Sequence, residues 1–351
     1  MPKVAVVPGD GVGKEVTREA VKAVRAVTAG TDLELDLVEW PHGADRYLET
    51  GEAITDAEFD DLRTNYQAIL LGALGDARVA GNEHARQILL GMRFKLDLYV
   101  NFRPVRLFHE RLTPLRDKGV DDVNMVIFRE NTEGVYVGMG GTFKQGTPDE
   151  VAVQEDVNTR KGVERIIRAA FEWARANGRT RVTMSDKANA MEFAGGMWRR
   201  VFKQLSAEYA DIESEALYVD MLAMDMVRRP ERYQVIVTGN LFGDILSDLG
   251  AQLAGGLGLS PSGNIHPGKI GLFEPVHGSA PDLAGKDLAN PFAAILTAGL
   301  MLEHLGRPDL GKRLEDAVRA CIVEGETTPD LGGTLGTAAA GDAIVRRLRG
   351  A

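Results

Sequence analysis

The sequence predicts an α/β protein of two domains built on a largely parallel sheet. Apolar runs rich in β-branched residues alternate with segments of helical period, a pattern typical of parallel strands joined by helices. A chain of 351 residues is longer than most single domains, which favours two. Charged and amide side chains follow directly after three of the apolar runs, at the carboxyl ends where open parallel sheets bind ligands.

The expected elements follow one another along the chain. The best helix candidate, "VERIIRAAFEWARANG", places Ile166, Ile167, Ala170, Phe171 and Ala174 on one face, and Asn177-Gly178 closes it as a C-cap would. The irregular, glycine-rich segment 136–159 predicts a projecting hairpin or arm. The predicted strands are 4–7, 68–73, 123–128, 181–184 and 235–238, and the predicted helices are 14–29, 84–98, 161–177, 193–209, 242–254, 291–305 and 310–324.

Composition excludes several classes of protein. The formal net charge of −10 argues against nucleic acid or an anionic membrane as the main partner, because either would favour a basic surface. Cys321 is the only cysteine, so there is no intrachain disulfide and no thiolate metal site. No apolar run approaches 18 residues, and "KVAVV" follows the first two residues with no signal-type stretch. We therefore expect a cytoplasmic protein.

The opening turn "PGDGVGKEV" resembles a nucleotide loop but fails both patterns. Only three residues separate Gly9 from Gly13, and Glu15 stands where a phosphate loop needs a magnesium-binding hydroxyl. The spacing G-x-G-x-G also departs from the dinucleotide fingerprint. We expect a strand-to-helix turn whose glycines provide positive φ angles and close packing.

"GDILSD" places Asp244 and Asp248 four residues apart in a helical segment, so both carboxylates project from one face. Like charges at this spacing repel unless a cation lies between them. Oxygen ligands without nearby cysteine or histidine favour Mg²⁺ or Mn²⁺ over Zn²⁺. A hydrated acidic helix face would give the same spacing.

Basic residues near the expected strand ends could bind an anionic ligand. Arg103 and Arg129 flank apolar runs, where a guanidinium can grip a carboxylate in two places, and Arg93 lies in the preceding helix. Lys187 and Tyr136 lie in loops beyond such runs; a lysine near arginines and a metal would have its pKa lowered and could act as a base. Each residue alone would be an ordinary surface group.

The late segment "FEPVHGSAPDLAGKDLANP" (273–291) predicts a binding loop. Its backbone amides and Asp282 suit a ligand rich in hydroxyl groups, since an acidic side chain accepts from a ribose 2′-hydroxyl and repels a 2′-phosphate.

These stretches, with "RENTEGVYVG", "DKAN", "YVDMLAM" and "TGNLFGDILSD", resemble the isocitrate and isopropylmalate dehydrogenase family along nearly the whole chain. The resemblance implies a non-Rossmann fold with a discontinuous cofactor-side domain (1–98 plus 256–351). It also implies a middle domain (99–255) that carries the dimer interface and the arm. The opening turn then lies beside the cleft and binds no phosphate.

The resemblance also implies roles for individual residues. Lys187 is the base on the substrate hydroxyl and Tyr136 the proton donor, in a homodimer whose active sites are shared between subunits. The implied metal ligands are Asp220, Asp244 and Asp248 for Mg²⁺ or Mn²⁺; the implied substrate ligands are Arg93, Arg103 and Arg129, with Leu89 and Leu90 facing the apolar substituent; and the implied NAD-binding residues are Asn189, His277, Gly278, Ser279, Ala280, Pro281, Asp282 and Asn290.

The implied reaction is NAD-dependent oxidative decarboxylation of 3-isopropylmalate to 2-oxoisocaproate, a step of leucine synthesis. A homoisocitrate enzyme would carry arginine at the Leu90 position. Ala85, Arg86 and Ala190 depart from the family pattern, which keeps open the same chemistry on homoisocitrate, isocitrate, malate or tartrate. Two further hypotheses are a nucleotide-binding subunit without turnover and a phosphate-loop NTPase.

Overall fold

The structure is a computed structural model that describes residues 1–350, and the chain divides into two compact units. Unit 1 comprises 1–98, 106–120 and 251–351 of the chain, and unit 2 comprises 99–105 and 121–250. Residues 106–120 and 251–255, which lie within the expected middle domain (99–255), group with unit 1 by their contacts. Arg106 forms an ion pair with Glu315, and the Arg111 guanidinium donates to the carbonyl oxygens of Leu331 and Ile322.

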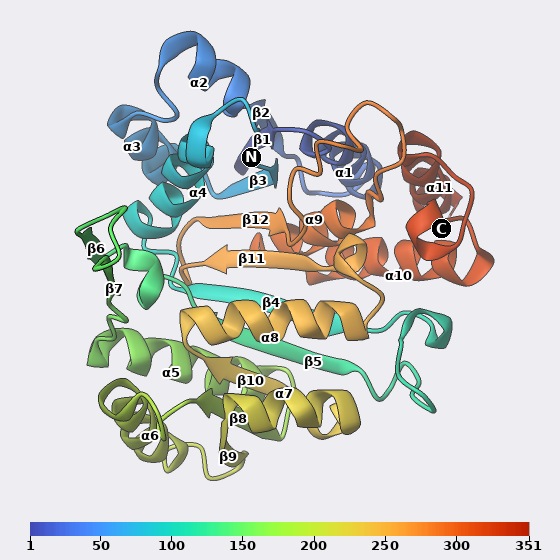
Figure 1. The fold of residues 1–351 in the computed structure, drawn as a ribbon. Coiled ribbons are helices and arrows are strands. Elements are labelled where there is room, and N and C mark those ends of the chain that lie inside the picture. The colour runs from blue at the N-terminus through green and yellow to red at the C-terminus, as the bar shows by residue number, and fades with distance from the viewer. Residues whose placement is uncertain (351) are drawn as a thin grey trace. The chain divides into compact units, whose positions relative to one another are not determined.

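Unit 1 contains five strands in the order β2-β1-β3-β12-β11 (Figure 1). All neighbours among them pair in parallel except β11 and β12, which are antiparallel. The strands are β1 (Lys3–Gly9), β2 (Asp36–Glu39), β3 (Ala68–Ala73), β11 (Pro261–Ile265) and β12 (Gly271–Pro275). The helices are α1 (Gly13–Thr28), α2 (Ala44–Thr50), α3 (Asp56–Asn65), α4 (Glu83–Lys95), α9 (Phe292–His304), α10 (Pro308–Glu324) and α11 (Thr337–Gly350).

The apolar runs of β1 and β3 are buried on both faces. Val4 and Val6 pack into a core with α1, α9, α10 and α11, whereas the alternate residues Ala5 and Val7 pack into a second core with α3 and α4. Because successive side chains of a strand point to opposite faces, a strand covered on both sides requires a continuous apolar run. This explains why the sequence identified these two strands.

Unit 2 contains five strands in the order β4-β5-β10-β8-β9, and β5, β10, β8 and β9 pair in parallel. The strands are β4 (Val100–Arg106), β5 (Asn124–Glu130), β8 (Arg181–Asp186), β9 (Glu213–Tyr218) and β10 (Val235–Thr238). The helices are α5 (Arg160–Ala176), α6 (Glu192–Ser206), α7 (Val219–Arg228) and α8 (Asn240–Leu253). The predicted apolar face of α5 is confirmed, since all five of its residues are buried.

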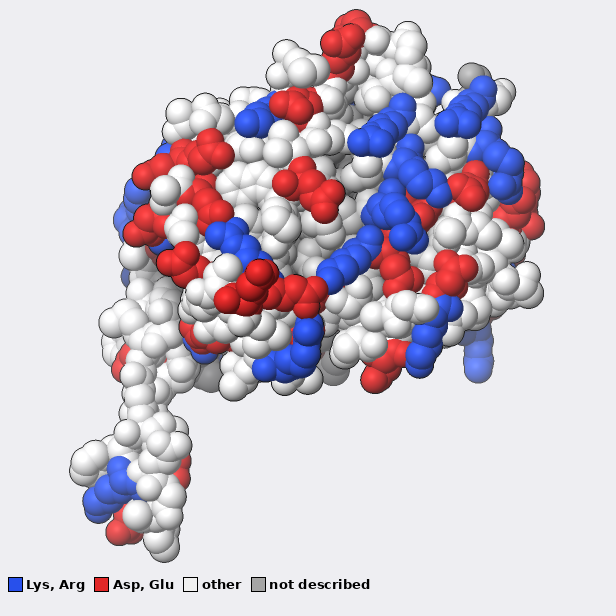
Figure 2. All heavy atoms as spheres, turned by 90° about the horizontal axis from the view of Figure 1, so that it is seen from above, with Lys and Arg blue, Asp and Glu red and all other residues white. Residues whose placement is uncertain are grey.

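The hairpin predicted within 136–159 is present. It consists of β6 (Gly140–Phe143) and β7 (Val151–Gln154), which pair in antiparallel fashion and are exposed at every residue. Figure 2 shows this arm as a narrow projection at the lower left. Such an exposed two-stranded ribbon gains little from packing within its own chain.

The α/β class and every predicted strand and helix are confirmed, with bounds that shift by at most three residues. Short 3₁₀ turns lie at Ala80–Asn82, Glu110–Leu112, Val135–Val137, Pro230–Arg232, Leu257–Leu259 and Pro329–Leu331. Within residues 1–350, no helix has the length and apolar character needed to cross a bilayer.

Candidate functional site

The register of the unit 2 sheet aligns the carboxyl ends of β5, β8 and β10, from which the polar segments 129–134, 185–189 and 239–244 continue. Arg129 at the end of β5 lies opposite Thr238 of β10, and Thr238 lies opposite Ser185 of β8. Beyond this edge, a hollow of about 50 Å³ is lined by residues that follow β8 and β10, among them Lys187 and Asn240, and by Val135. The polar segments after β8 and β10 therefore share one hollow within unit 2, whereas no residue of 129–134 lines it.

Asp244 lies at the centre of a network on the first turns of α8. Arg129 donates through Nη1 to Asp244 Oδ1 and through Nε to Asn240 Oδ1, the latter over 2.9 Å. The Tyr136 hydroxyl, from the turn Val135–Val137, donates to Asp244 Oδ2 over 2.9 Å. Arg129 is 1% exposed, so its guanidinium has a fixed orientation toward the carboxylate.

Arg103 on β4 faces the second carboxylate. Its Nη1 lies 3.5 Å from Asp248 Oδ1, and its Nη2 lies 3.9 Å from Asp244 Oδ1. Asn101 and Ser247 orient this guanidinium, accepting hydrogen bonds of 2.8 Å and 3.0 Å. Burial and the neighbouring Asp244 carboxylate raise the pKa of Asp248, although Arg103 opposes the shift.

The site contains two carboxylates and two neighbouring guanidinium groups, so acidic and basic side chains are present in equal number. Asp244 and Asp248 keep 37% and 58% of their side-chain surfaces exposed, so both have oxygen atoms open to a ligand. Hard divalent cations take such oxygen ligands, and the arginines suit the carboxylates of an anionic substrate. The chemistry of this donor set fits a divalent cation together with a hydroxyacid.

The third predicted metal ligand lies elsewhere in unit 2. Asp220, in the first turn of α7, accepts a hydrogen bond of 2.6 Å from Lys187 Nζ, and this bond lowers the pKa of Asp220. Within residues 1–350, no three acidic, histidine or cysteine side chains are grouped closely enough to hold a metal ion. One chain therefore offers two of the three expected carboxylates at the α8 site.

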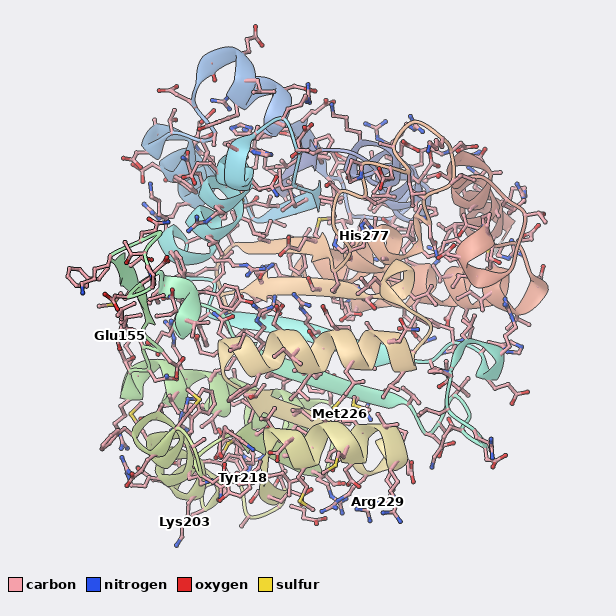
Figure 3. The ribbon with its side chains drawn as sticks, viewed as in Figure 1. Glu155, Lys203, Tyr218, Met226, Arg229 and His277 are labelled. Atoms are coloured by element: carbon pink, nitrogen blue, oxygen red, sulfur yellow. The ribbon has the colours of Figure 1, made fainter. Side chains whose placement is uncertain are left out.

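Lys187 and Asn189 lie in the turn between β8 and α6. Lys187 Nζ also lies 5.9 Å from the centre of the Tyr218 ring, which Figure 3 shows near the end of β9. Asn189 is exposed. The Lys187 ammonium group pairs with the Asp220 carboxylate of the same chain.

Arg93, Leu89 and Leu90 belong to α4 of unit 1. The Arg93 Nη2 donates to Glu274 Oε1 over 3.0 Å, and its buried Nε has no hydrogen-bond partner among residues 1–350. That unused donor suits an additional acceptor such as a substrate carboxylate. Leu89 packs against the unit 1 core, and Leu90 is half-buried.

The opening turn contacts the late loop directly. Val12 N donates to the Ser279 carbonyl oxygen over 2.8 Å, and Gly11 has a φ of +52°. A Cβ at Gly11 would lie 2.1 Å from that oxygen, so only glycine fits. Glu15 accepts from Gly285 N in the same loop, while Lys14 donates to Asp45. The glycines therefore shape a turn against the loop, as predicted.

Apart from Asn189, which lies in unit 2, the predicted cofactor residues lie together in the segment between β12 and α9. His277 begins it (Figure 3), and burial lowers the pKa of this imidazole. Ala280 has a φ of +38°, and the Asn290 side chain bridges Asp330 and the Phe292 amide. Gly278, Pro281 and Asp282 are exposed, so their polar groups are open to a ligand.

Sequence reasoning missed the residues that orient the arginines. Asn101, Asn240 and Glu274 each bind a guanidinium, and their partners lie far away in sequence, apart from the Asn101–Arg103 pair. For Asn240 the sequence contained one local indication of its role. It lies just after the end of β10 and is the first residue of α8, the helix that carries Asp244 and Asp248.

The comparisons with known proteins agree over the whole chain. The family profile described as isocitrate/isopropylmalate dehydrogenase matches residues 3–344. The chain is 46% identical to a 3-isopropylmalate dehydrogenase of Thermobifida fusca (99% of this chain, 97% of the relative) and 49% identical to one of Leifsonia xyli (90% and 89%). A crystal structure of isocitrate dehydrogenase from Methylococcus capsulatus matches with a TM-score of 0.90 at 40% identity, covering 99% of this chain and 100% of that one.

Proposed function

The chain belongs to the isocitrate/isopropylmalate dehydrogenase family, and on that premise we propose that it converts 3-isopropylmalate and NAD to 2-oxoisocaproate, CO₂ and NADH in leucine biosynthesis. The observation that carries the proposal is the Arg129–Asp244–Tyr136 network with Arg103 beside Asp248. This network brings together groups that can bind a dianionic substrate, hold a divalent cation and donate a proton.

The residues of unit 2 have complementary roles in this proposal. Arg103 and Arg129 bind the malate carboxylates, because a guanidinium offers paired donors to a carboxylate. Asp244 and Asp248 would hold Mg²⁺ or Mn²⁺ together with Asp220 of the partner subunit. Such an ion would supply Lewis-acid chemistry for the 2-hydroxyl group and for the negative charge that develops when CO₂ leaves.

In this proposal Lys187 and Tyr136 carry out the proton transfers. Lys187 of the partner subunit removes the hydroxyl proton while hydride leaves C2 for NAD, which forms the ketone. Loss of the C3 carboxylate as CO₂ then leaves an enolate at C3. The Tyr136 hydroxyl, held by Asp244, donates the proton that forms the final keto acid.

The cofactor residues of unit 1 would bind NAD through the loop after β12. Asp282 would accept from the 2′-hydroxyl of the adenosine ribose and repel a 2′-phosphate, which favours NAD over NADP. His277, Gly278, Ser279, Ala280, Pro281 and Asn290 would surround the adenosine half, with Asn189 near the nicotinamide.

A homodimer accounts for the split of the metal ligands. Lys187 and Asp220 form a pair of their own in one chain, apart from the group around Asp244. The faces of α7 and α8 also expose large apolar side chains: Met221 49%, Met224 68%, Val227 45%, Leu241 40% and Ile245 57%. A patch of this kind marks a protein interface, so we infer that a second copy covers it and brings in its own Lys187 and Asp220.

Isocitrate is the second candidate substrate, because the solved relative is an isocitrate dehydrogenase. Leu89 and Leu90 favour an apolar substituent instead, since a third carboxylate beside two leucines would be buried without a partner. The test is NADH formation with 3-isopropylmalate, isocitrate, homoisocitrate, malate and tartrate. The proposal requires 3-isopropylmalate to give the highest kcat/KM, and a higher value for any other substrate refutes it.

A further inference from the structure

A basic groove runs along one flank of α1 in unit 1, outside every residue assigned a role above. It is a hollow of about 610 Å³ at the carboxyl ends of the parallel strands β1 and β2. Its lining includes five cationic side chains, Lys14, Arg18, Lys22, Arg25 and Arg46, against two acidic ones, Glu39 and Asp45. Arg46 pairs with Glu58, which is not part of the lining, so the four cations of α1 account for the positive charge of the groove. This positive charge lies in a protein whose formal net charge is −10.

Four of these cations form one stripe on α1. Lys14, Arg18 and Lys22 follow at intervals of four residues, and Arg25 comes three residues later, so all project from the same side of the helix. Like charges four residues apart destabilise a helix. The arrangement therefore favours a bound anion that offsets the repulsion.

The cations of the stripe are unequally neutralised. Lys14 binds Asp45, and Lys22 contacts Glu19 and Asp342. Arg18 contacts only its neighbour Glu19, through Nε at 3.2 Å, and keeps 60% of its side chain exposed. Arg25 has no carboxylate within 4 Å among residues 1–350. The guanidinium groups with the most binding capacity left are therefore Arg18 and Arg25.

The dimensions favour a ligand with two adjacent phosphates. Arg18 and Arg25 are seven residues apart, about 10.5 Å along the helix axis, and Lys22 lies between them. Flexible guanidinium arms can converge on a diphosphate from both ends of that span. Apolar residues of the same lining, Val6, Pro8, Val21 and Pro41, leave room for an organic group attached to it.

We propose that the groove binds a small diphosphate-bearing molecule, at a site separate from the predicted cofactor loop. None of the groove residues comes from 277–290, and that loop contacts Val12 and Glu15, which do not line the groove. The proposal does not depend on the reaction, so a different substrate for the active site leaves it intact.

The test is calorimetric titration of the full-length protein with inorganic pyrophosphate in metal-free buffer of low ionic strength. The variant R18Q/R25Q removes the two least neutralised cations. The matched control R116Q/R349Q removes two exposed arginines of unit 1 that lie outside the groove. A third variant, R103Q, reports any binding of pyrophosphate at the substrate site.

We expect wild-type protein, the control and R103Q to bind pyrophosphate with a Kd below about 1 mM, and R18Q/R25Q to bind it at least about tenfold more weakly. Citrate should bind more weakly than pyrophosphate. The proposal is overturned if binding is absent, if R103Q abolishes it, if the control weakens it as much as R18Q/R25Q, or if citrate binds as tightly as pyrophosphate.

Discussion

Gly243 on α8 controls the position of Arg129, and its replacement by alanine tests whether that position matters. A Cβ at residue 243 would lie 2.5 Å from Arg129 Cγ and 2.6 Å from its Cβ. Carbon atoms in contact prefer about 3.5–4.0 Å, so Arg129 must move by about 1 Å. A displacement of that size at a positioning residue costs about 100-fold in rate. We therefore expect kcat/KM of Gly243→Ala to fall about 100-fold.

The loss of stability should be small enough to leave the variant folded. Alanine gains about 0.5–1 kcal/mol over glycine within a helix, whereas overpacking costs about 1–3 kcal/mol. The free energy of unfolding, measured by urea denaturation, should therefore fall by no more than about 2.5 kcal/mol.

Gly196→Ala is the matched control on α6 of the same unit. Its Cβ would meet only the Nη1 end of Arg200, at 3.3 Å, and a flexible side chain can move aside. The control should keep wild-type kcat/KM, measured by initial rates of NADH formation. A Gly243→Ala enzyme within about twofold of wild type would refute the assignment of Arg129 to the substrate.

Three further substitutions test individual roles. Tyr136→Phe removes the hydroxyl group that Asp244 holds; kcat should fall by about 10²–10⁴-fold, and unchanged NADH production would exclude Tyr136 as the proton donor. Leu90→Arg should raise kcat/KM for isocitrate or homoisocitrate relative to 3-isopropylmalate, because it pairs the additional carboxylate; an unchanged ratio would place Leu90 outside the substrate pocket. Asp248→Asn should raise Tm in metal-free buffer at pH 7. Burial raises the pKa of Asp248, so the native state holds this proton more tightly than the unfolded state, and stability is lost as pH rises through the folded pKa. The gain should vanish below that pKa, and Mg²⁺ should raise the Tm of the wild type more than that of the variant; an equal response of both to Mg²⁺ would exclude Asp248 as a ligand.

The predictable parts of the fold are those whose residues match one local pattern. β3 reads "AILLGA" because helices cover both of its faces, and α5 shows a regular apolar stripe. β4 was missed because its sequence "VNFRPVR" places Arg103, Arg106 and a proline among apolar residues. β11 ("PSGNI") and β9 ("ESEALY") lack an apolar run altogether, and their strand pairing comes from their neighbours.

The site was predictable where its chemistry is local. The four-residue spacing of Asp244 and Asp248 indicated a shared helix face before any contact was known. The contacts of Arg129 depend on the register of β5 against β10, which places its guanidinium beside the start of α8. No local pattern encodes that register. The pairing of Lys187 with Asp220 is non-local in the same way, and it separates these groups from the α8 carboxylates of their own chain.

The central claim is that each active site combines Asp244 and Asp248 of one chain with Lys187 and Asp220 of another. Mixing two inactive variants, Lys187→Ala and Asp244→Asn, tests it directly. Each mixed dimer would contain one site with both defects and one site with none. Random assembly from equal amounts gives half mixed dimers, so the account predicts recovery of about 25% of wild-type kcat per site. If each chain formed its own complete site, the mixed preparation would stay inactive, and that result would contradict the account.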